Sequence, residues 1–124
     1  MPDDDVLTAT SRATAGHYGW GPGCDGWRLL DGGDLSVIEE LVPVGGAEQW
    51  HVHDRARQLF YVLAGTAELR SSTGTVALAP GAAVEVPPGV AHQFASTGDV
   101  AVRFLVTSAP STRGDRREVP PPPG

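Results

Sequence analysis

Residues 45–65, GGAEQWHVHDRARQLFYVLAG, place two of the four histidines of this chain two positions apart. In an extended strand this spacing sends His51 and His53 to the same face, where both imidazoles can reach one metal ion. The run 58–63 that follows is aromatic and β-branched, which is typical of a strand, so that 54–57 forms the connection. The stretch therefore predicts a hairpin with metal ligands at its mouth.

The rest of the chain has the composition of a single all-β domain. Its length of 124 residues suits one domain, and 16 Gly and 11 Pro separate short apolar runs without a long helical period. These runs predict strands at 27–30, 35–42, 58–63, 66–70, 75–78, 83–86, 92–95 and 100–107. Short strands at intervals of about ten residues indicate a sandwich or a barrel.

The composition also suggests where the domain begins and ends. Residues 1–15 hold few large apolar side chains and predict a flexible N-terminal arm, whereas 16–109 form the β-barrel domain. Residues 110–124 are polar and proline-rich, which predicts a flexible C-terminal tail. Within the domain, the Gly-rich and aromatic stretch 17–26 predicts an irregular loop that could act as a lid.

The charge and cysteine content exclude some classes of binding partner and indicate the cellular compartment. A net charge of −6 argues against a nucleic-acid binder, and the basic cluster Arg113, Arg116 and Arg117 falls in the expected tail, where we expect it to be solvated. The chain has no 18-residue apolar run and an acidic start, so we expect no membrane partner and a cytoplasmic location. Cys24 is the only cysteine, which agrees with a reducing compartment, and we interpret it as incidental rather than as a nucleophile.

Two groups of residues resemble the two motifs of the cupin superfamily. The first group is Gly45, His51, His53, Gln58 and Gly65, and the second is Gly81, Pro87, Gly89, His92 and Ser96. Gln58 stands where the family usually has glutamate, and Ser96 stands where it has asparagine; the other positions agree. The resemblance covers residues 45–96 and implies an all-β double-stranded β-helix, the jelly-roll or cupin barrel.

Three of the histidines are the predicted metal ligands. His51, His53 and His92 lie at expected strand starts and turns, where a buried imidazole needs a partner and a metal is the commonest one. The resemblance implies a divalent transition metal, namely Fe, Mn, Ni, Cu or Zn. His17 lies outside the motifs and is interpreted as a loop histidine, with contact to substrate as the alternative.

Gln58 leaves three interpretations open. Its amide oxygen coordinates the metal as a fourth ligand, or its amide donates a hydrogen bond to a bound molecule beside a three-histidine site, or the site is degenerate and holds no metal. Compared with a carboxylate, the neutral amide should weaken the affinity for the metal and leave the ion a stronger Lewis acid.

Side-chain alternation predicts the pocket. If Gln58 faces inward, then Phe60 and Val62 do too, and Phe94 shares the face of His92. The outward face would then carry apolar side chains, at Leu59, Tyr61 and Leu63, that need a cover. Either the N-terminal loop with Trp20 and Trp27 supplies it or a second subunit does, so we expect a homodimer. By the same parity Glu48 should point to solvent, which leaves no obvious general base.

Two classes of function follow from the resemblance. The first is a metal-dependent enzyme acting on a small organic molecule with vicinal oxygens. With Fe, Mn, Ni or Cu the resemblance implies dioxygenase chemistry, and with Zn it implies Lewis-acid isomerisation, cyclisation or elimination, which the missing carboxylate favours slightly. The second class is a non-catalytic cupin that binds a sugar or another small effector and uses the metal as a structural element.

Overall fold

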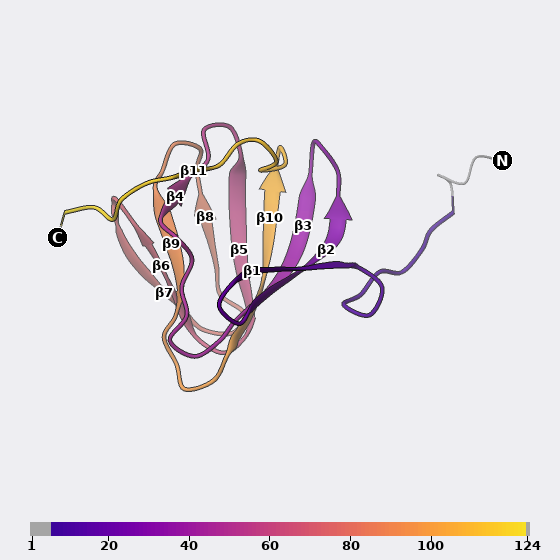
Figure 1. Cartoon of the computed structure of the whole chain (residues 1–124), viewed down its shortest axis with the longest axis horizontal. Helices are drawn as coiled ribbons and strands as arrows, with labels where there is room; N and C mark the ends of the chain where they lie inside the picture. Colours follow the sequence, from indigo (N-terminus) through magenta and orange to yellow (C-terminus); the bar gives the residue numbers. More distant parts are fainter. Residues whose placement is uncertain (1–5, 124) are drawn as a thin grey trace.

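The structure, a computed structural model, describes residues 6–123, and all regular secondary structure in this range is β-strand (Figure 1). No helix in residues 6–123 is long and apolar enough to cross a membrane. The strands in chain order are β1 (Gly16–Gly21), β2 (Cys24–Asp31), β3 (Ser36–Val42), β4 (His51–Val52), β5 (Arg57–Ala64), β6 (Ala67–Ser71), β7 (Gly74–Leu78), β8 (Ala83–Val86), β9 (His92–Ser96), β10 (Val102–Ala109) and β11 (Arg117–Glu118).

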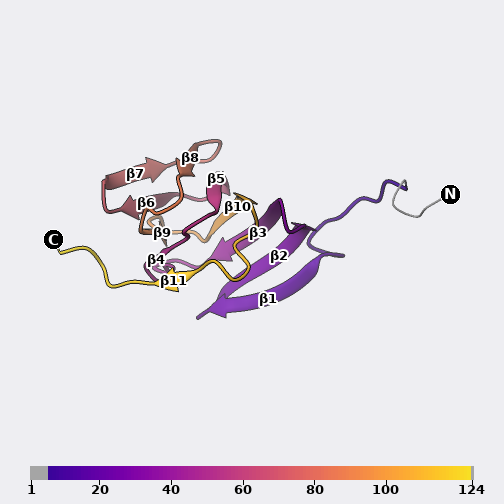
Figure 2. The same ribbon diagram turned by 90° about the horizontal axis from the view of Figure 1, so that it is seen from above.

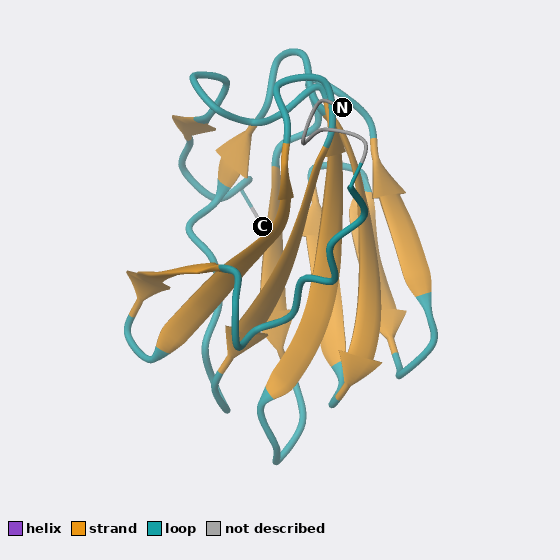
Figure 3. Cartoon of the chain, turned by 90° about the vertical axis from the view of Figure 1, so that its right-hand side faces the viewer, coloured by secondary structure: helices purple, strands orange, loops and turns teal. Residues whose placement is uncertain are grey.

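The strands form two antiparallel sheets. One sheet has the order β1-β2-β3-β10-β5-β8 and the other the order β11-β4-β9-β6-β7 (Figure 2). Figure 3 shows the two layers of strands from the side, joined by loops at both ends. This arrangement confirms the expected all-β double-stranded β-helix, or jelly-roll. In it, β4, β5 and β9 bring both sequence motifs to the interior of one barrel.

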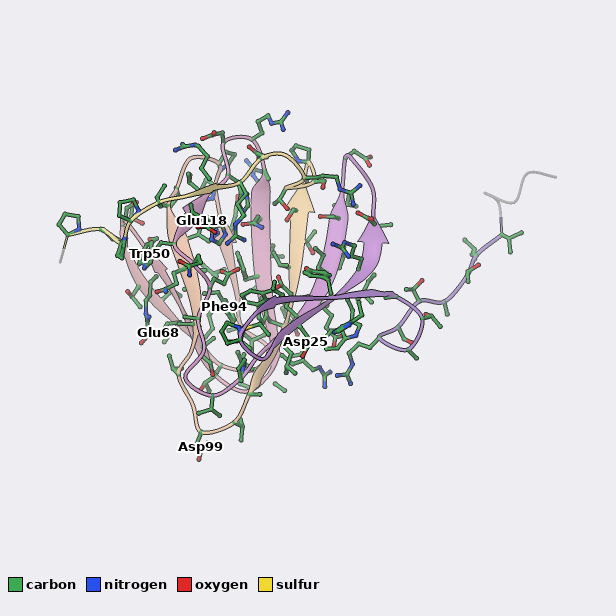
Figure 4. All side chains as sticks on the ribbon, viewed as in Figure 1. Asp25, Trp50, Glu68, Phe94, Asp99 and Glu118 are labelled. Atoms are coloured by element: carbon green, nitrogen blue, oxygen red, sulfur yellow. The ribbon has the colours of Figure 1, made fainter. Side chains whose placement is uncertain are left out.

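An aromatic core fixes the strands behind the site. Along β5, Phe60 and Val62 are buried while Leu59 and Tyr61 are exposed, which is the alternation that a strand with one buried face requires. The ring of Phe94 from β9 stacks on Phe104 from β10 at a centroid distance of 3.9 Å and on Phe60 at 5.5 Å. Each fully buried phenylalanine stabilises the fold by about 1.5–3 kcal/mol. In Figure 4, Phe94 lies in the middle of the barrel.

The stretch 17–26 is mostly strand, so the expected irregular loop is wrong. Residues 16–21 form β1, which pairs with β2 at the edge of the larger sheet. The ring of Tyr18 lies over Gly26, where an added Cβ would clash with the Tyr18 Cζ. An aromatic ring covering a glycine stabilises a Gly-rich edge strand that propensity alone would not predict.

The segment after Ala109, expected to be a flexible tail, packs on the barrel. Its residues 117 and 118 pair with β4 as strand β11. Two of its three arginines form ion pairs and stay exposed to solvent, as expected: Arg113 contacts Asp31 at 2.8 Å, and Arg117 contacts Asp54 at 3.0 Å. In Figure 1 this segment, drawn in yellow, runs across the upper end of the barrel. The ordered domain therefore extends beyond residue 109.

The other end of the chain is less closely attached. Residues 6–15 extend away from the sheets in Figure 1, and Arg12 contacts Glu39 at 3.2 Å. The remainder of the predicted arm, residues 1–5, lies outside the described part of the chain.

The outward face of β5 has no cover within residues 6–123. Leu59 and Tyr61 are 44% and 39% exposed. Trp20, the proposed cover from the N-terminal loop, packs against the core instead and lines the interior cavity. The homodimer that would bury this face stays a prediction.

Candidate metal centre

The three motif histidines meet at one point of the barrel. His51 of β4 pairs directly with His92 of β9, and His53 follows β4 on the same face as His51. All three are buried, and one possible ligand atom from each lies within 4.8 Å of the others. The ring centroids of His51 and His92 are 4.4 Å apart, and those of His51 and His53 are 4.9 Å apart. This cluster has the spacing that a single metal ion requires.

Backbone carbonyls fix the orientation of all three rings. The Nδ1 atoms of His51, His53 and His92 lie 2.7, 2.6 and 2.9 Å from the carbonyl oxygens of Gln49, Asp115 and Val90. A carbonyl only accepts hydrogen bonds, so each Nδ1 carries the proton and each Nε2 keeps its lone pair. The His92 Nε2 is buried without a hydrogen-bond partner among the described residues. These lone pairs fit a metal ion, which prefers such a nitrogen set.

Burial keeps these imidazoles neutral. It lowers the pKa of His51 to about 3 and the pKa of His92 to about 4, against a partial increase from their hydrogen bonds to carbonyls. Burial also lowers the pKa of His53. Histidine must be neutral to bind a metal, so the site is ready for a metal at neutral pH without releasing protons.

Gln58 lines the same cavity as His51 and His53. Its Nε2 donates a hydrogen bond to the Ser108 Oγ at 3.1 Å. Its Oε1 is buried and has no hydrogen-bond partner among residues 6–123. Since the amide nitrogen is bound to Ser108, the oxygen is the atom left for a metal or a ligand. This contact favours the interpretation of Gln58 as a ligand over that of Gln58 as an amide donor, and coordination stays a prediction.

A cavity of about 290 Å³ opens beside the histidine cluster and is lined by His51 and His53 but not by His92. Phe60 forms part of its wall, as predicted, but Val62 and Phe94 do not line it. Both are completely buried in the core, deeper along their strands than Gln58 and His92. The alternation of side chains along a strand predicts which residues point into the barrel. It does not predict whether such a residue packs in the hydrophobic core or lines the cavity. The lining residues are Tyr18, Trp20, Ile38, Glu40, Glu48, His51, His53, Gln58, Phe60, Val106, Ser108, Thr112, Arg116 and Glu118.

Two buried carboxylates in this wall were not predicted from the sequence. Glu48 is only 7% exposed, so its expected solvent position is wrong, and Glu40 of β3 is 8% exposed. Glu48 lies outside the strands, directly after the isolated bridge between Ala47 and Ala95, and its Oε1 accepts a hydrogen bond from the Phe94 backbone N–H at 3.0 Å. For Glu40 a signal existed, because it alternates with the buried Ser36 and Val42 along β3.

Burial shifts the acidity of both carboxyls. It raises the pKa of Glu48 to about 7, although the Phe94 N–H and the charge of Arg116 lower it in part. Burial, followed by the charge of Glu48, raises the pKa of Glu40 well above its usual range. Glu48 therefore gains and loses a proton near neutral pH, which is the property of a general acid or base, and Glu40 beside it holds its proton more tightly than an ordinary carboxyl.

The Glu48→Gln variant should reveal this shift as a pH-dependent stability difference. An unfolded glutamate has a pKa of about 4.3, so the folded protein binds the additional proton up to about pH 7. The stability from this proton is fully present below pH 4.3 and is lost as the pH rises through 7. The advantage of the glutamine variant over the parent should thus grow by on the order of 2 kcal/mol between pH 5 and pH 8.

Urea unfolding of the metal-free proteins at both pH values measures this difference. The lowered pKa values of the histidines act in the opposite direction, but they are common to parent and variant and cancel in the comparison. Glu85→Gln, which changes an exposed carboxylate on β8, is the control and should show no such growth. A constant difference for Glu48→Gln would contradict the assignment.

The other candidate residues lie in different environments. The His17 Nε2 lies 2.8 Å from the Asp25 Oδ1, and His17 does not line the cavity. Burial raises the pKa of the Cys24 thiol, which keeps it protonated and agrees with an incidental cysteine. Tyr18 does line the cavity, and burial raises the pKa of its hydroxyl far above the usual value, so this group stays a hydrogen-bond donor.

Comparisons with known proteins show what this chain is similar to. The family model described as Cupin domain (Cupin_2) matches residues 38–108, more than half of the chain. The uncharacterized protein MJ1618 of Methanocaldococcus jannaschii is 25% identical over 92 residues, which are 74% of each chain.

Two solved structures share the fold. A sugar phosphate isomerase from a cupin superfamily, from Silicibacter pomeroyi, is 24% identical with a TM-score of 0.64, covering 72% of this chain and 60% of that chain. This chain thus spans less than two thirds of that protein. The polyketide cyclase RemF from Streptomyces resistomycificus is 22% identical with a TM-score of 0.77, covering 94% of this chain and 87% of that chain.

Proposed function

This chain belongs to the cupin domain family, and from that premise we propose that it is a metal-dependent enzyme acting on a small, oxygen-rich organic molecule. The observation that carries the proposal is that His51 and His53, two of the three clustered histidines, line the same cavity as the buried carboxylates Glu40 and Glu48. A purely structural metal would need the histidines but would not need buried carboxylates beside an open space, where each costs free energy.

The carboxylates favour proton-transfer chemistry, that is, an isomerisation or cyclisation. When bound, the metal would supply Lewis-acid polarisation of a substrate oxygen. Glu48 and Glu40 accept a proton from one substrate atom and return a proton to another, which leaves the substrate neither oxidised nor reduced. The Tyr18 hydroxyl donates a hydrogen bond, and Trp20 and Phe60 exclude water from the wall.

The similar structures give this class of reaction some support. One is named as a sugar phosphate isomerase and the other as a polyketide cyclase. Both names describe reactions that rearrange a substrate by moving protons and bonds. A dioxygenase and a non-catalytic binding protein are the competing functions, and the experiment below separates all three.

The test exposes the metal-loaded protein to candidate 1,2-diols, enols and keto acids with and without oxygen. A product formed without oxygen is the expected result, and the Glu48→Gln variant should lose this activity while keeping its metal. Oxygen uptake coupled to turnover would favour a dioxygenase instead. Binding without turnover under both conditions would favour the binding protein.

A second variant, Gln58→Glu, tests the unusual amide. A carboxylate at this position adds a negative charge where the Gln58 Oε1 has no partner, so the affinity for a divalent metal should rise by about tenfold or more. The same charge should weaken the metal as a Lewis acid and slow the reaction. Chelator competition measures the affinity, with Gln93→Glu as the control, because Gln93 lies on the other sheet and does not line the cavity. An unchanged affinity for Gln58→Glu would show that Gln58 lies outside the metal's reach.

A further inference from the structure

Arg116 is distinguished from the other arginines by its surroundings. All 9 basic residues of the chain are arginines. Within residues 6–123, seven of them form ion pairs, and the guanidinium of Arg28 lies 4.1 Å from the ring centroid of Tyr18. The seven are Arg12, Arg55, Arg57, Arg70, Arg103, Arg113 and Arg117. Arg116 has neither an ion pair nor a hydrogen bond with any residue that the structure describes, and it lines the cavity.

The backbone of Arg116 is held firmly over this cavity. The preceding residue, Asp115, is buried, and its carboxylate accepts hydrogen bonds from the backbone N–H groups of Asp54, Arg55 and Ala56 at 2.9–3.3 Å. On the other side, strand β11 pairs with β4, and the Val119 N–H donates to the Trp50 carbonyl. Figure 4 labels Glu118 on this segment and Trp50, which directly precedes β4. Arg116 is therefore anchored on both sides.

The guanidinium charge acts on the cavity without contacting its carboxylates. Arg116 lowers the pKa of Glu48, although burial outweighs it. None of the ion pairs within residues 6–123 joins Arg116 to Glu40 or Glu48, so its fork of N–H donors remains available. A guanidinium and a metal cation in the same cavity repel each other because their charges have the same sign. An anion bound between them would relieve this repulsion.

We propose that Arg116 binds an acidic group of the substrate, so that the site takes a small organic acid with a carboxylate or phosphate at the cavity mouth and its vicinal oxygens at the histidines. The placement of those oxygens at the histidines rests on the proposed function. The binding of the anionic group by Arg116 does not depend on it. Arginine presents paired N–H donors that match both carboxylate and phosphate. The cavity of about 290 Å³ is slightly smaller than the usual range of about 300–1,000 Å³ for small-molecule pockets, which suits a compact metabolite.

The test compares two catechol probes that carry an acidic group with a neutral catechol ester. Calorimetry with zinc-loaded and metal-free protein measures the dissociation constants of 3,4-dihydroxybenzoate, its neutral methyl ester and 3,4-dihydroxyphenylphosphonate. The parent should prefer the better of the two acids over the ester by about tenfold or more. The acid with the lower dissociation constant identifies the anion as carboxylate or phosphate. Arg116→Gln should remove the preference for the acid and leave binding of the ester unchanged, and Arg116→Lys should keep part of the preference.

Arg117→Gln is the matched control, because Arg117 pairs with the exposed Asp54 and does not line the cavity. It should bind all three probes like the parent. Equal binding of acids and ester by the parent, an equal loss in both arginine variants, or no binding of either acid at millimolar concentration would overturn the proposal. Elemental analysis of the same samples separates the two hypotheses. If the protein holds metal but does not prefer the acids, the role of Arg116 is refuted and the metal-enzyme proposal stands. If the protein holds no metal but still prefers the acids, the metal-enzyme proposal is refuted and the role of Arg116 stands.

Discussion

His92→Ala is expected to lower the affinity for a divalent transition metal by more than about 100-fold, since losing even an outer partner of a metal ligand costs 10- to 100-fold. His92 comes from β9, and its Nε2 is one of three lone pairs that meet at the site. Two histidines from a single short strand region cannot surround an ion, so the cross-strand ligand is indispensable. Competition with a chelator of known affinity measures the loss.

The control for this variant is His17→Ala. His17 lies in β1, pairs with Asp25 and does not line the cavity. It should keep the parent's affinity, and thermal unfolding of both metal-free variants shows whether the fold is intact. Parent-like affinity in a folded His92→Ala protein would contradict the three-histidine site, as would an equal loss in the His17→Ala protein.

Asp115→Ala should both destabilise the barrel and weaken the metal site. The variant leaves buried backbone N–H groups of residues 54–56 without their acceptor. The backbone carbonyl of Asp115 also accepts the His53 Nδ1 hydrogen at 2.6 Å, so a shift of this segment disturbs a metal ligand. We expect a fall of about 10 °C in the melting temperature, because several hydrogen bonds to one charged group are lost. The affinity for metal should fall about 10- to 100-fold.

Asp31→Ala is the matched control for this second variant. Asp31 also contacts the C-terminal segment, through Arg113, but this ion pair is exposed and should contribute little. Asp115→Asn keeps one acceptor oxygen and should fall between the parent and the alanine variant. If Asp115→Ala is no less stable than Asp31→Ala, the Asp115 carboxylate does not hold the C-terminal segment in place, and if it binds metal like the parent, that segment does not support the metal site.

The strands and the three histidines were predictable because their signals are local or lie in fixed spacings. Gly65, which ends the first motif, shows why such spacing persists. Its φ is +80°, and an added Cβ would lie 2.5 Å from the carbonyl oxygen of Ala101. Glycine is required at position 65 because two backbone segments approach closely there. This requirement fixes the spacing in the sequence between Gly65 and the ligands His51 and His53.

The features that sequence reasoning missed depend on contacts between distant residues. Strand β1 is stabilised by Tyr18 covering Gly26 across the hairpin, and Asp115 meets residues 54–56 some 60 positions away. Proline and charge composition around Asp115 predicts a tail, since nothing local reveals an acceptor for three amides. Glu48 and Arg116 were misplaced for the same reason: their positions over the cavity are set by neighbours that only the folded chain supplies.

The most direct test of the central claim is elemental analysis of the purified protein after metal loading and dialysis. The account predicts about one divalent transition metal ion per chain for the parent, and none for the variant in which His51, His53 and His92 are all alanine. Absence of stoichiometric metal in the parent, or full metal content in the folded triple variant, would contradict it.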